Sequence, residues 1–231
     1  MSSKLRIVSA EDLQLCNGKV SISLLAEAAS NVNMRLRAAV ASTGKIRLDL
    51  YEIIDLRMLS GLMGEMFSTE VSKNENRLIK NPNIDGYPDL CDVSKPGKKS
   101  AVNSYSINSF LAYDDGGFEV KNTFGVKKSN THIAQGECRL TKIQKKLVWK
   151  AHHRETNNLI AIHSDYVNKV PQIIAAFYTD MLEESDWTVK QQPKEGSTMT
   201  SFCQTTPSAF LKLKNGLMFF MEGIGHEQFL R

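Results

Sequence analysis

The stretch Asp-Asp-Gly-Gly-Phe-Glu-Val-Lys at residues 114–121 joins a turn to the start of a strand. Its two aspartates and two glycines are typical of a tight turn. The next four residues alternate between apolar and charged, as in a strand with one face buried. Because side chains alternate between the two faces of a strand, Phe118 and Val120 are expected to face the core. Glu119 and Lys121 then lie side by side on the opposite face.

The chain around this strand predicts an order of helices first and a sheet afterwards. Apolar residues recur at helical spacing over residues 21–41 and again over 48–67, with Ser42-Thr43-Gly44 as the break and Glu65 near the end of the second helix. The region 95–99 is expected to be a loop. Further predicted elements are a strand at 104–113, a basic amphipathic helix at 139–151, buried strands at 159–166 and 172–178, and a hairpin of 210–214 and 217–221 about Asn215-Gly216.

This order predicts an α/β (α+β) fold in which helices flank a mixed β-sheet. Its 231 residues are enough for a single domain with a substantial core. Within that domain we expect an N-terminal helical part over about residues 20–47 and a C-terminal strand-rich extension over about 167–231.

Composition is that of an ordinary soluble protein. The formal net charge is +4, which permits nucleic-acid binding without arguing for it. The four cysteines form no CxxC pair, no apolar signal segment opens the chain, and no stretch reaches the roughly 20 apolar residues of a membrane span. A cytoplasmic protein with no membrane association is therefore expected.

A second acidic residue, Asp89, follows Pro88 at the end of the stretch Ile-Asp-Gly-Tyr-Pro-Asp at 84–89. Placed on a neighbouring strand, it completes a cluster with Glu119 and Lys121. Two carboxylates with no thiol or imidazole nearby form a site of hard oxygen ligands, which suits Mg²⁺. A lysine beside such a metal can hold a water and balance charge on a reacting phosphate.

This succession of elements resembles the core of the PD-(D/E)xK nucleases. The resemblance covers roughly residues 48–166, and the length of the chain and the phrase at 84–90 look most like a type II restriction endonuclease. It implies a restriction-endonuclease-like core with extra C-terminal strands. It also implies Mg²⁺ held by Asp89, Glu119 and the backbone carbonyl of Val120, Lys121 positioning the nucleophilic water, and Glu65 joining the catalytic residues.

The function expected from this resemblance is Mg²⁺-dependent, sequence-specific hydrolysis of double-stranded DNA by a homodimer, with a cognate DNA methyltransferase as a possible companion in the same restriction system. Two alternatives stay open: a repair or recombination nuclease, such as a nicking enzyme or a resolvase, and a non-catalytic DNA-binding regulator. The basic residues expected to contact DNA are Lys98, Lys99, Lys127, Lys128, Arg139 and Lys142.

Overall fold

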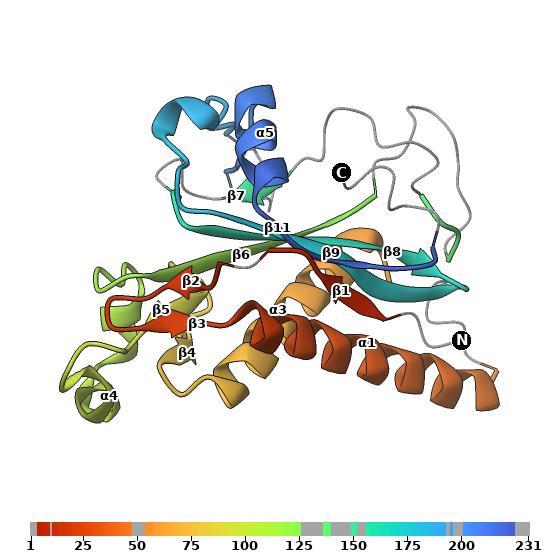
Figure 1. Cartoon of the computed structure of the whole chain (residues 1–231), viewed down its shortest axis with the longest axis horizontal. Helices are drawn as coiled ribbons and strands as arrows, with labels where there is room; N and C mark the ends of the chain where they lie inside the picture. Colours follow the sequence, from red (N-terminus) through yellow and green to blue (C-terminus); the bar gives the residue numbers. More distant parts are fainter. Residues whose placement is uncertain are drawn as a thin grey trace.

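The fold is mixed α/β, with a large mixed sheet flanked by helices (Figure 1). We analysed a computed structural model of the 231-residue chain, which describes residues 4–9, 11–47, 54–125, 136–139, 149–151, 156–192, 195 and 201–224. Among these residues, no helix is both long and apolar enough to cross a membrane.

Seven strands form the main sheet, in the spatial order β1-β11-β9-β8-β6-β5-β4. Only β6 and β8 run parallel; the other neighbouring pairs are antiparallel. The C-terminal strands thus belong to the same sheet as the strand that carries Glu119. The bounds are β1 Leu5–Ile7, β4 Leu78–Lys80, β5 Leu90–Asp92, β6 Gly117–Phe124, β8 Leu159–Val167, β9 Val170–Thr179 and β11 Leu217–Met221.

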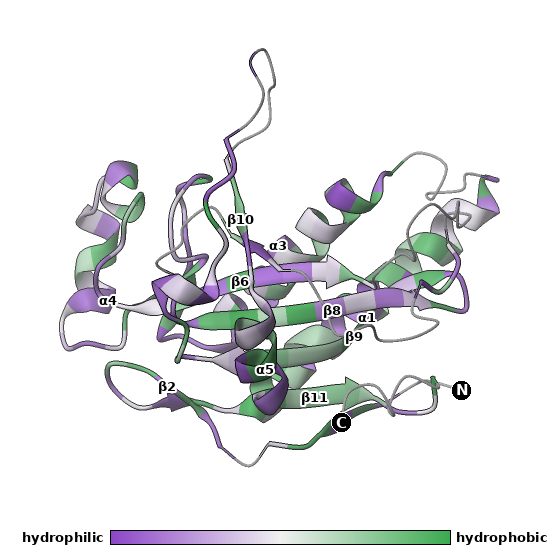
Figure 2. Cartoon of the chain, turned by 90° about the horizontal axis from the view of Figure 1, so that it is seen from above, coloured by the Kyte–Doolittle hydropathy of each residue, from purple (hydrophilic) through white to green (hydrophobic). Residues whose placement is uncertain are grey.

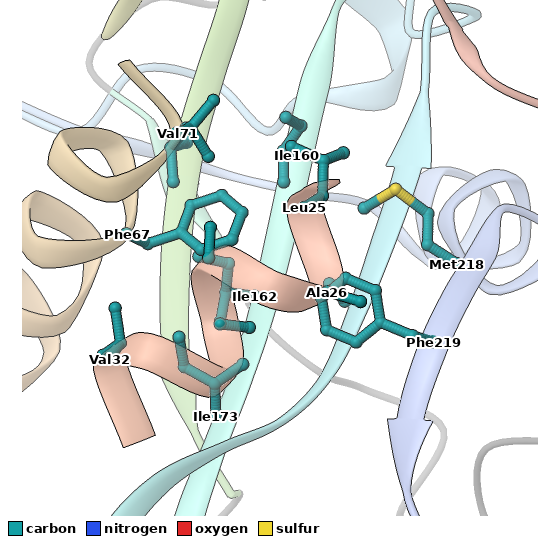
Figure 3. Close-up of a cluster of buried hydrophobic side chains, with 14 of the residues drawn as sticks. Leu25, Ala26, Val32, Phe67, Val71, Ile160, Ile162, Ile173, Met218 and Phe219 are labelled. Carbon is teal, nitrogen blue, oxygen red and sulfur yellow. The ribbon is translucent and has the colours of Figure 1, made fainter. Parts of the chain in front are cut away.

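Two long helices, α1 (Ile22–Lys45) and α3 (Leu56–Asn74), cover one face of this sheet, below it in Figure 1. Each begins at a capping side chain: Ser21 accepts from the amide of Leu24, and Asp55 accepts from the amides of Arg57 and Met58. Their apolar stripes pack on the sheet in one large cluster (Figure 3). This core fixes the position of α3 against β6, and β6 carries Glu119 and Lys121.

A second, smaller core lies on the other face, under helix α5 (Pro207–Asn215). Trp149 and Trp187 are buried in it, and each indole N–H donates to a backbone carbonyl, of Ile162 and Thr156 respectively. Beside this core, β7 (Lys150–Ala151) pairs with β10 (Cys203–Gln204). The remaining short elements are the hairpin of β2 (Leu13–Gln14) and β3 (Lys19–Val20), the helix α4 (Lys98–Ala101), and the 3₁₀ turns η1 (Val102–Ser104), η2 (Ile107–Phe110) and η3 (Glu184–Asp186).

The predicted first helix, the turn at 114–117 and the strands at 159–166 and 172–178 are confirmed, with shifts at their ends. The first helix continues through the expected break at 42–44 as far as Lys45. The second begins at Leu56 and ends at Asn74, so Glu65 lies in its middle and not near its end. Residues 48–53, at the predicted start of that helix, lie outside the described part of the chain.

Four predicted elements are wrong in whole or in part. Residues 104–113 form 3₁₀ turns and loop, because Tyr105, Phe110 and Tyr113 pack together at spacings of five and three. Residues 207–215 form helix α5, so Asn215-Gly216 ends a helix and does not turn a hairpin. Lys98 and Lys99 begin the short helix α4. Of the predicted helix at 139–151, residues 140–148 are not described and Lys150–Ala151 is a strand.

Candidate active site

Asp89 can reach β6 because strand β5 begins only at the next residue, Leu90. The antiparallel register of β5 and β6 ends at Leu90 opposite Phe118, and no other strand of the described residues pairs with the next part of this β6 edge. Asp89 lies directly before β5, and its Oδ2 accepts the Val120 amide at 2.8 Å. The carboxylate therefore takes the place of a strand carbonyl on this edge.

The loop that precedes Asp89 is held by the buried side chain of Asn81. Its Nδ2 donates to the carbonyls of Pro88 (3.0 Å) and Phe110 (2.8 Å), and its backbone amide donates to the Asp89 carbonyl at 2.9 Å. Gly86 packs against the same side chain, where a Cβ would collide with Asn81 and with the Phe110 carbonyl. The glycine and the asparagine together fix the backbone that presents Asp89.

Glu119 and Lys121 lie on the same face of β6, as the alternation predicts, and Phe118 and Val120 are buried in the core on the other face. Lys121 Nζ lies 2.5 Å from Glu119 Oε1 and 3.4 Å from Asp89 Oδ2. One ammonium thus serves two carboxyl groups, and with both of these ionised the three side chains carry a formal charge of −1. We call Asp89, Glu119 and Lys121 the acidic site.

Glu119 is the most buried member of the acidic site, with a side chain 4% exposed. Its Oε2 is buried and has no hydrogen-bond partner in the described part of the chain. Burial raises the pKa of Glu119 to about 7; Lys121 opposes this rise and Asp89 adds to it. For Lys121, burial alone would lower the pKa, but Asp89 and Glu119 outweigh it and hold the pKa above its usual value.

The backbone of Val120 faces the same edge as Asp89. The Glu119 amide donates to the Asn158 carbonyl at 3.0 Å, toward β8, so the backbone groups of the next residue point away from β8. The Val120 amide points away from β8 in this way, because it donates to Asp89 Oδ2. By the geometry of a strand, the Val120 carbonyl points to this side of β6 as well.

A groove of about 860 Å³ opens beside the acidic site. One wall is α3, the floor is the edge of β6 from Val120 to Phe124, and the other wall is formed by β7 and Phe202. Asp89 and Lys121 line it, and the α3 wall presents the small residues Ser60, Gly61, Gly64 and Ser68. A Cβ added to Gly61 or Gly64 would meet nothing within 4 Å. The groove is therefore open along the helix.

Glu65 lines this groove, and with Ser68 and Asp89 it also lines an adjoining cavity of about 420 Å³. Its side chain is 59% exposed and forms an ion pair with Lys80 on β4. Within the described ranges, no three Asp, Glu, His or Cys side chains come close enough to hold a metal ion. The structure thus places Glu65 near Asp89, on the same groove, without joining it to Asp89 and Glu119 as a third carboxylate ligand.

The predicted DNA-contacting residues fall in different places. Arg139 lines the groove, and its Nε donates to the Gly125 carbonyl at 3.1 Å. Lys98 forms an ion pair with Asp115, and neither it nor Lys99 lines the groove. Lys127, Lys128 and Lys142 lie outside the described residues.

Sequence reasoning assigned no role to several residues around the acidic site. Burial raises the pKa of the Tyr87 phenol, which hydrogen-bonds Thr156 and lies within the electrostatic influence of Glu119, Lys121 and Asp89. In the sequence, the signal that could have pointed to Tyr87 is its position two residues before Asp89. Arg57, Lys150 and Phe202 also line the groove, and as single residues in separate elements they left no motif to find.

Comparisons with models of known protein families, with curated proteins and with solved structures found no match.

Proposed function

We propose that this protein is a Mg²⁺-dependent endonuclease that hydrolyses phosphodiester bonds of double-stranded DNA at specific sequences, in the manner of a type II restriction enzyme. The observation that carries the proposal is the convergence of Asp89, Glu119 and Lys121 at one strand edge, on an open groove. The resemblance to the PD-(D/E)xK nucleases supports the same reading, because it assigns roles to these three residues.

The residues present fit a hard divalent cation. Asp89 and Glu119 supply carboxylate oxygens, and Glu119 Oε2 is buried with no hydrogen-bond partner among the described residues. A buried, unpartnered oxygen is costly unless a cation or a donor compensates it. Two carboxylates and the Val120 carbonyl would hold Mg²⁺ and leave its other positions to water and substrate phosphate, as this ion prefers.

When bound, Mg²⁺ polarises a phosphodiester and makes a coordinated water more acidic. Lys121 adds a positive charge between the two carboxylates. In the metal-free site, Asp89 and Glu119 outweigh burial and hold the pKa of Lys121 above its usual value, which favours a positively charged hydrogen-bond donor. We assign it the roles of donating hydrogen bonds to the attacking water and balancing the charge that develops on the phosphate.

Cleavage of both strands of a duplex needs two hydrolytic events, and the chain supplies one set of Asp89, Glu119 and Lys121. A homodimer with two-fold symmetry would place one set on each strand of a palindromic target. Such a target is also what a companion methyltransferase would protect. We therefore propose that the active enzyme is a homodimer.

The decisive experiment is incubation of the purified protein with phage DNA and Mg²⁺, followed by sequencing of the fragment ends. Discrete fragments that share one sequence at their ends are expected. Nicked circles from plasmid DNA, without linear product, would point to a repair or recombination nuclease. Binding that is independent of Mg²⁺, without any strand cleavage, would contradict an enzymatic role and favour a DNA-binding regulator.

A further inference from the structure

The groove beside the acidic site has two ends of opposite electrostatic character. At one end lie its two lining carboxylates, Glu65 and Asp89. The remaining charged residues of the described lining, apart from Lys121, are Arg57, Arg139 and Lys150. We call these three the cationic end. Of them, only Arg139 was expected from the sequence to contact DNA.

The direction of α3 along β6 fixes how these ends are arranged. Ser60 Oγ donates to the Asn122 carbonyl at 2.9 Å, and Asn122 Nδ2 donates back to the Ser60 carbonyl at 3.2 Å. Arg57 lies one turn before this contact and Glu65 more than one turn after it. With a rise of about 1.5 Å per residue, the eight positions from Arg57 to Glu65 span roughly 12 Å along the groove.

The positive charges at the cationic end are largely uncompensated. Lys150 forms no ion pair within the described part of the chain, and its Nζ lies 4.7 Å from the centre of the Phe202 ring. The Arg57 side chain is 81% exposed, and its ion pair among the described residues is with its own capping residue, Asp55, at 3.5 Å. Such an exposed pair is weak and leaves the guanidinium available to a ligand. Arg57 lies on the α3 wall and Lys150 on the β7 wall, so the two positive charges come to one groove from different elements.

We propose that the cationic end binds the phosphate backbone of one DNA strand, with Arg57 on the α3 wall and Lys150 on the β7 wall as the contacting groups. This inference rests on the proposed nuclease function. Guanidinium and ammonium groups suit phosphate oxygens, and the Phe202 ring gives the same wall a flat apolar face for a sugar or a base.

The first test is the salt dependence of DNA binding. A fluorescent 30-base-pair duplex of mixed sequence is titrated with protein in Ca²⁺, over a series of salt concentrations, by fluorescence anisotropy. Each phosphate contact contributes about −0.9 to the slope of log K against log salt. Arg57→Gln with Lys150→Gln should therefore flatten the slope by about two units.

The matched control is Arg6→Gln with Lys19→Gln, which removes the same charge. Arg6 lies on β1, at the opposite edge of the sheet, and Lys19 lies on the exposed β2–β3 hairpin. The control should leave the slope as in the wild type. Equal slopes for the groove variant and the control would overturn the proposal, and this result is informative whether or not the protein cleaves DNA.

The second test locates the contacted phosphate. Single neutral methylphosphonates are placed along one strand of a duplex that contains the mapped cleavage site. Binding should weaken at one or two positions that flank the cut, and this loss should vanish in the Arg57→Gln, Lys150→Gln variant. A sensitive phosphate that responds equally in wild type and variant would contradict the proposal.

The two proposals fail separately. A protein that cuts DNA while the groove variant behaves like the control retains the nuclease function and loses the cationic end as a phosphate site. A protein that cuts no DNA, but whose groove variant alone flattens the salt slope, retains the phosphate site and loses the nuclease function.

Discussion

Two clusters of lysine and carboxylate side chains in this molecule have similar parts and opposite character. On the surface, Lys95 and Lys98 both pair with Asp115, Lys95 at 3.0 Å, and all three side chains are partly exposed. At the edge of β6, Asp89 and Glu119 share the single ammonium of Lys121, and Glu119 is almost fully buried. The surface cluster carries a formal charge of +1, and the acidic site, with both carboxylates ionised, carries −1.

The difference shows that charge balance and burial, more than the presence of ion pairs, mark a candidate active site. Both oxygens of Asp115 are engaged by lysines, and exposed pairs of this kind contribute little to stability. In the acidic site one buried carboxylate oxygen has no partner among the described residues. The fold holds this oxygen in place, at a cost in stability that a bound cation would offset.

The largest expected effect concerns catalysis. Lys121→Ala, Asp89→Asn and Glu119→Gln should each lower the rate of DNA cleavage by about 10²- to 10³-fold or more, because each removes a metal ligand or the charge beside the phosphate. Lys95→Ala and Asp115→Asn, in the surface cluster, should cleave near the wild-type rate. Single-turnover cleavage measures these rates.

Because Lys121→Ala also leaves Glu119 without its ion pair, thermal unfolding of this variant is recorded in parallel. A folded Lys121→Ala protein that cleaves DNA at a near-normal rate would contradict the assignment of Lys121.

The two clusters should also respond to pH in opposite directions. In metal-free protein, folded Glu119 holds its proton up to a pKa of about 7, whereas the unfolded chain releases it near the ordinary glutamate pKa of 4.5. Between these values the folded state binds more protons, so the free energy of unfolding falls as pH rises, by up to about 3 kcal/mol. Glu119→Gln should remove this fall, as measured by urea unfolding from pH 4.5 to 8.

Asp115 supplies the opposite case. Lys98 and Lys95 lower its pKa, so its contribution to stability is present at neutral pH and is lost as pH drops below the usual range of an aspartate. Asp115→Asn should leave the slope between pH 4.5 and 7 unchanged. Identical slopes in wild type and Glu119→Gln would show that burial does not raise the pKa of Glu119.

A somewhat smaller effect is expected from metal binding. Mg²⁺ at 100 times its Kd should stabilise the wild type by about 2.7 kcal/mol, because it binds only the folded acidic site. Glu119→Gln should lose this stabilisation and Asp115→Asn should keep it. Thermal unfolding over a Mg²⁺ titration gives the comparison, and an equal shift in all three proteins would mean that the cation binds elsewhere.

The smallest effect concerns the surface ion pairs. Lys95→Ala should change the free energy of unfolding by less than about 1 kcal/mol, because the pair with Asp115 is exposed and Lys98 remains as a partner. Urea unfolding at low and high salt measures the change. A loss of several kcal/mol would mean that the surface cluster is structurally equivalent to the acidic site, and the comparison would fail.

The acidic site was predictable from sequence where strand geometry decides it. Alternation along residues 118–121 places Glu119 beside Lys121 whatever the rest of the fold. The burial of Glu119 and the partner-free oxygen were not predictable, because they depend on where β5 ends and on how tightly neighbouring elements pack. The same holds for Arg57 and Lys150, which come to one groove from elements far apart in the chain.

The wrong predictions came from local signals with two meanings. Asn215-Gly216 suits a hairpin turn and equally the end of a helix, and Thr206 with Pro207 provides the start signal that favours the helix. The region 104–113 has apolar residues at strand-like density, but its aromatic residues pack at spacings that a strand does not have. In both cases tertiary packing decides between two local structures.

The metal dependence of DNA cleavage tests the central claim most directly. Protein freed of divalent ions with EDTA is mixed with phage DNA, and Mg²⁺, Mn²⁺ or Ca²⁺ is added back. The acidic site predicts cleavage with Mg²⁺ and Mn²⁺, binding without cleavage with Ca²⁺, whose coordination is looser, and no cleavage in EDTA. Full cleavage in the chelator would contradict the account.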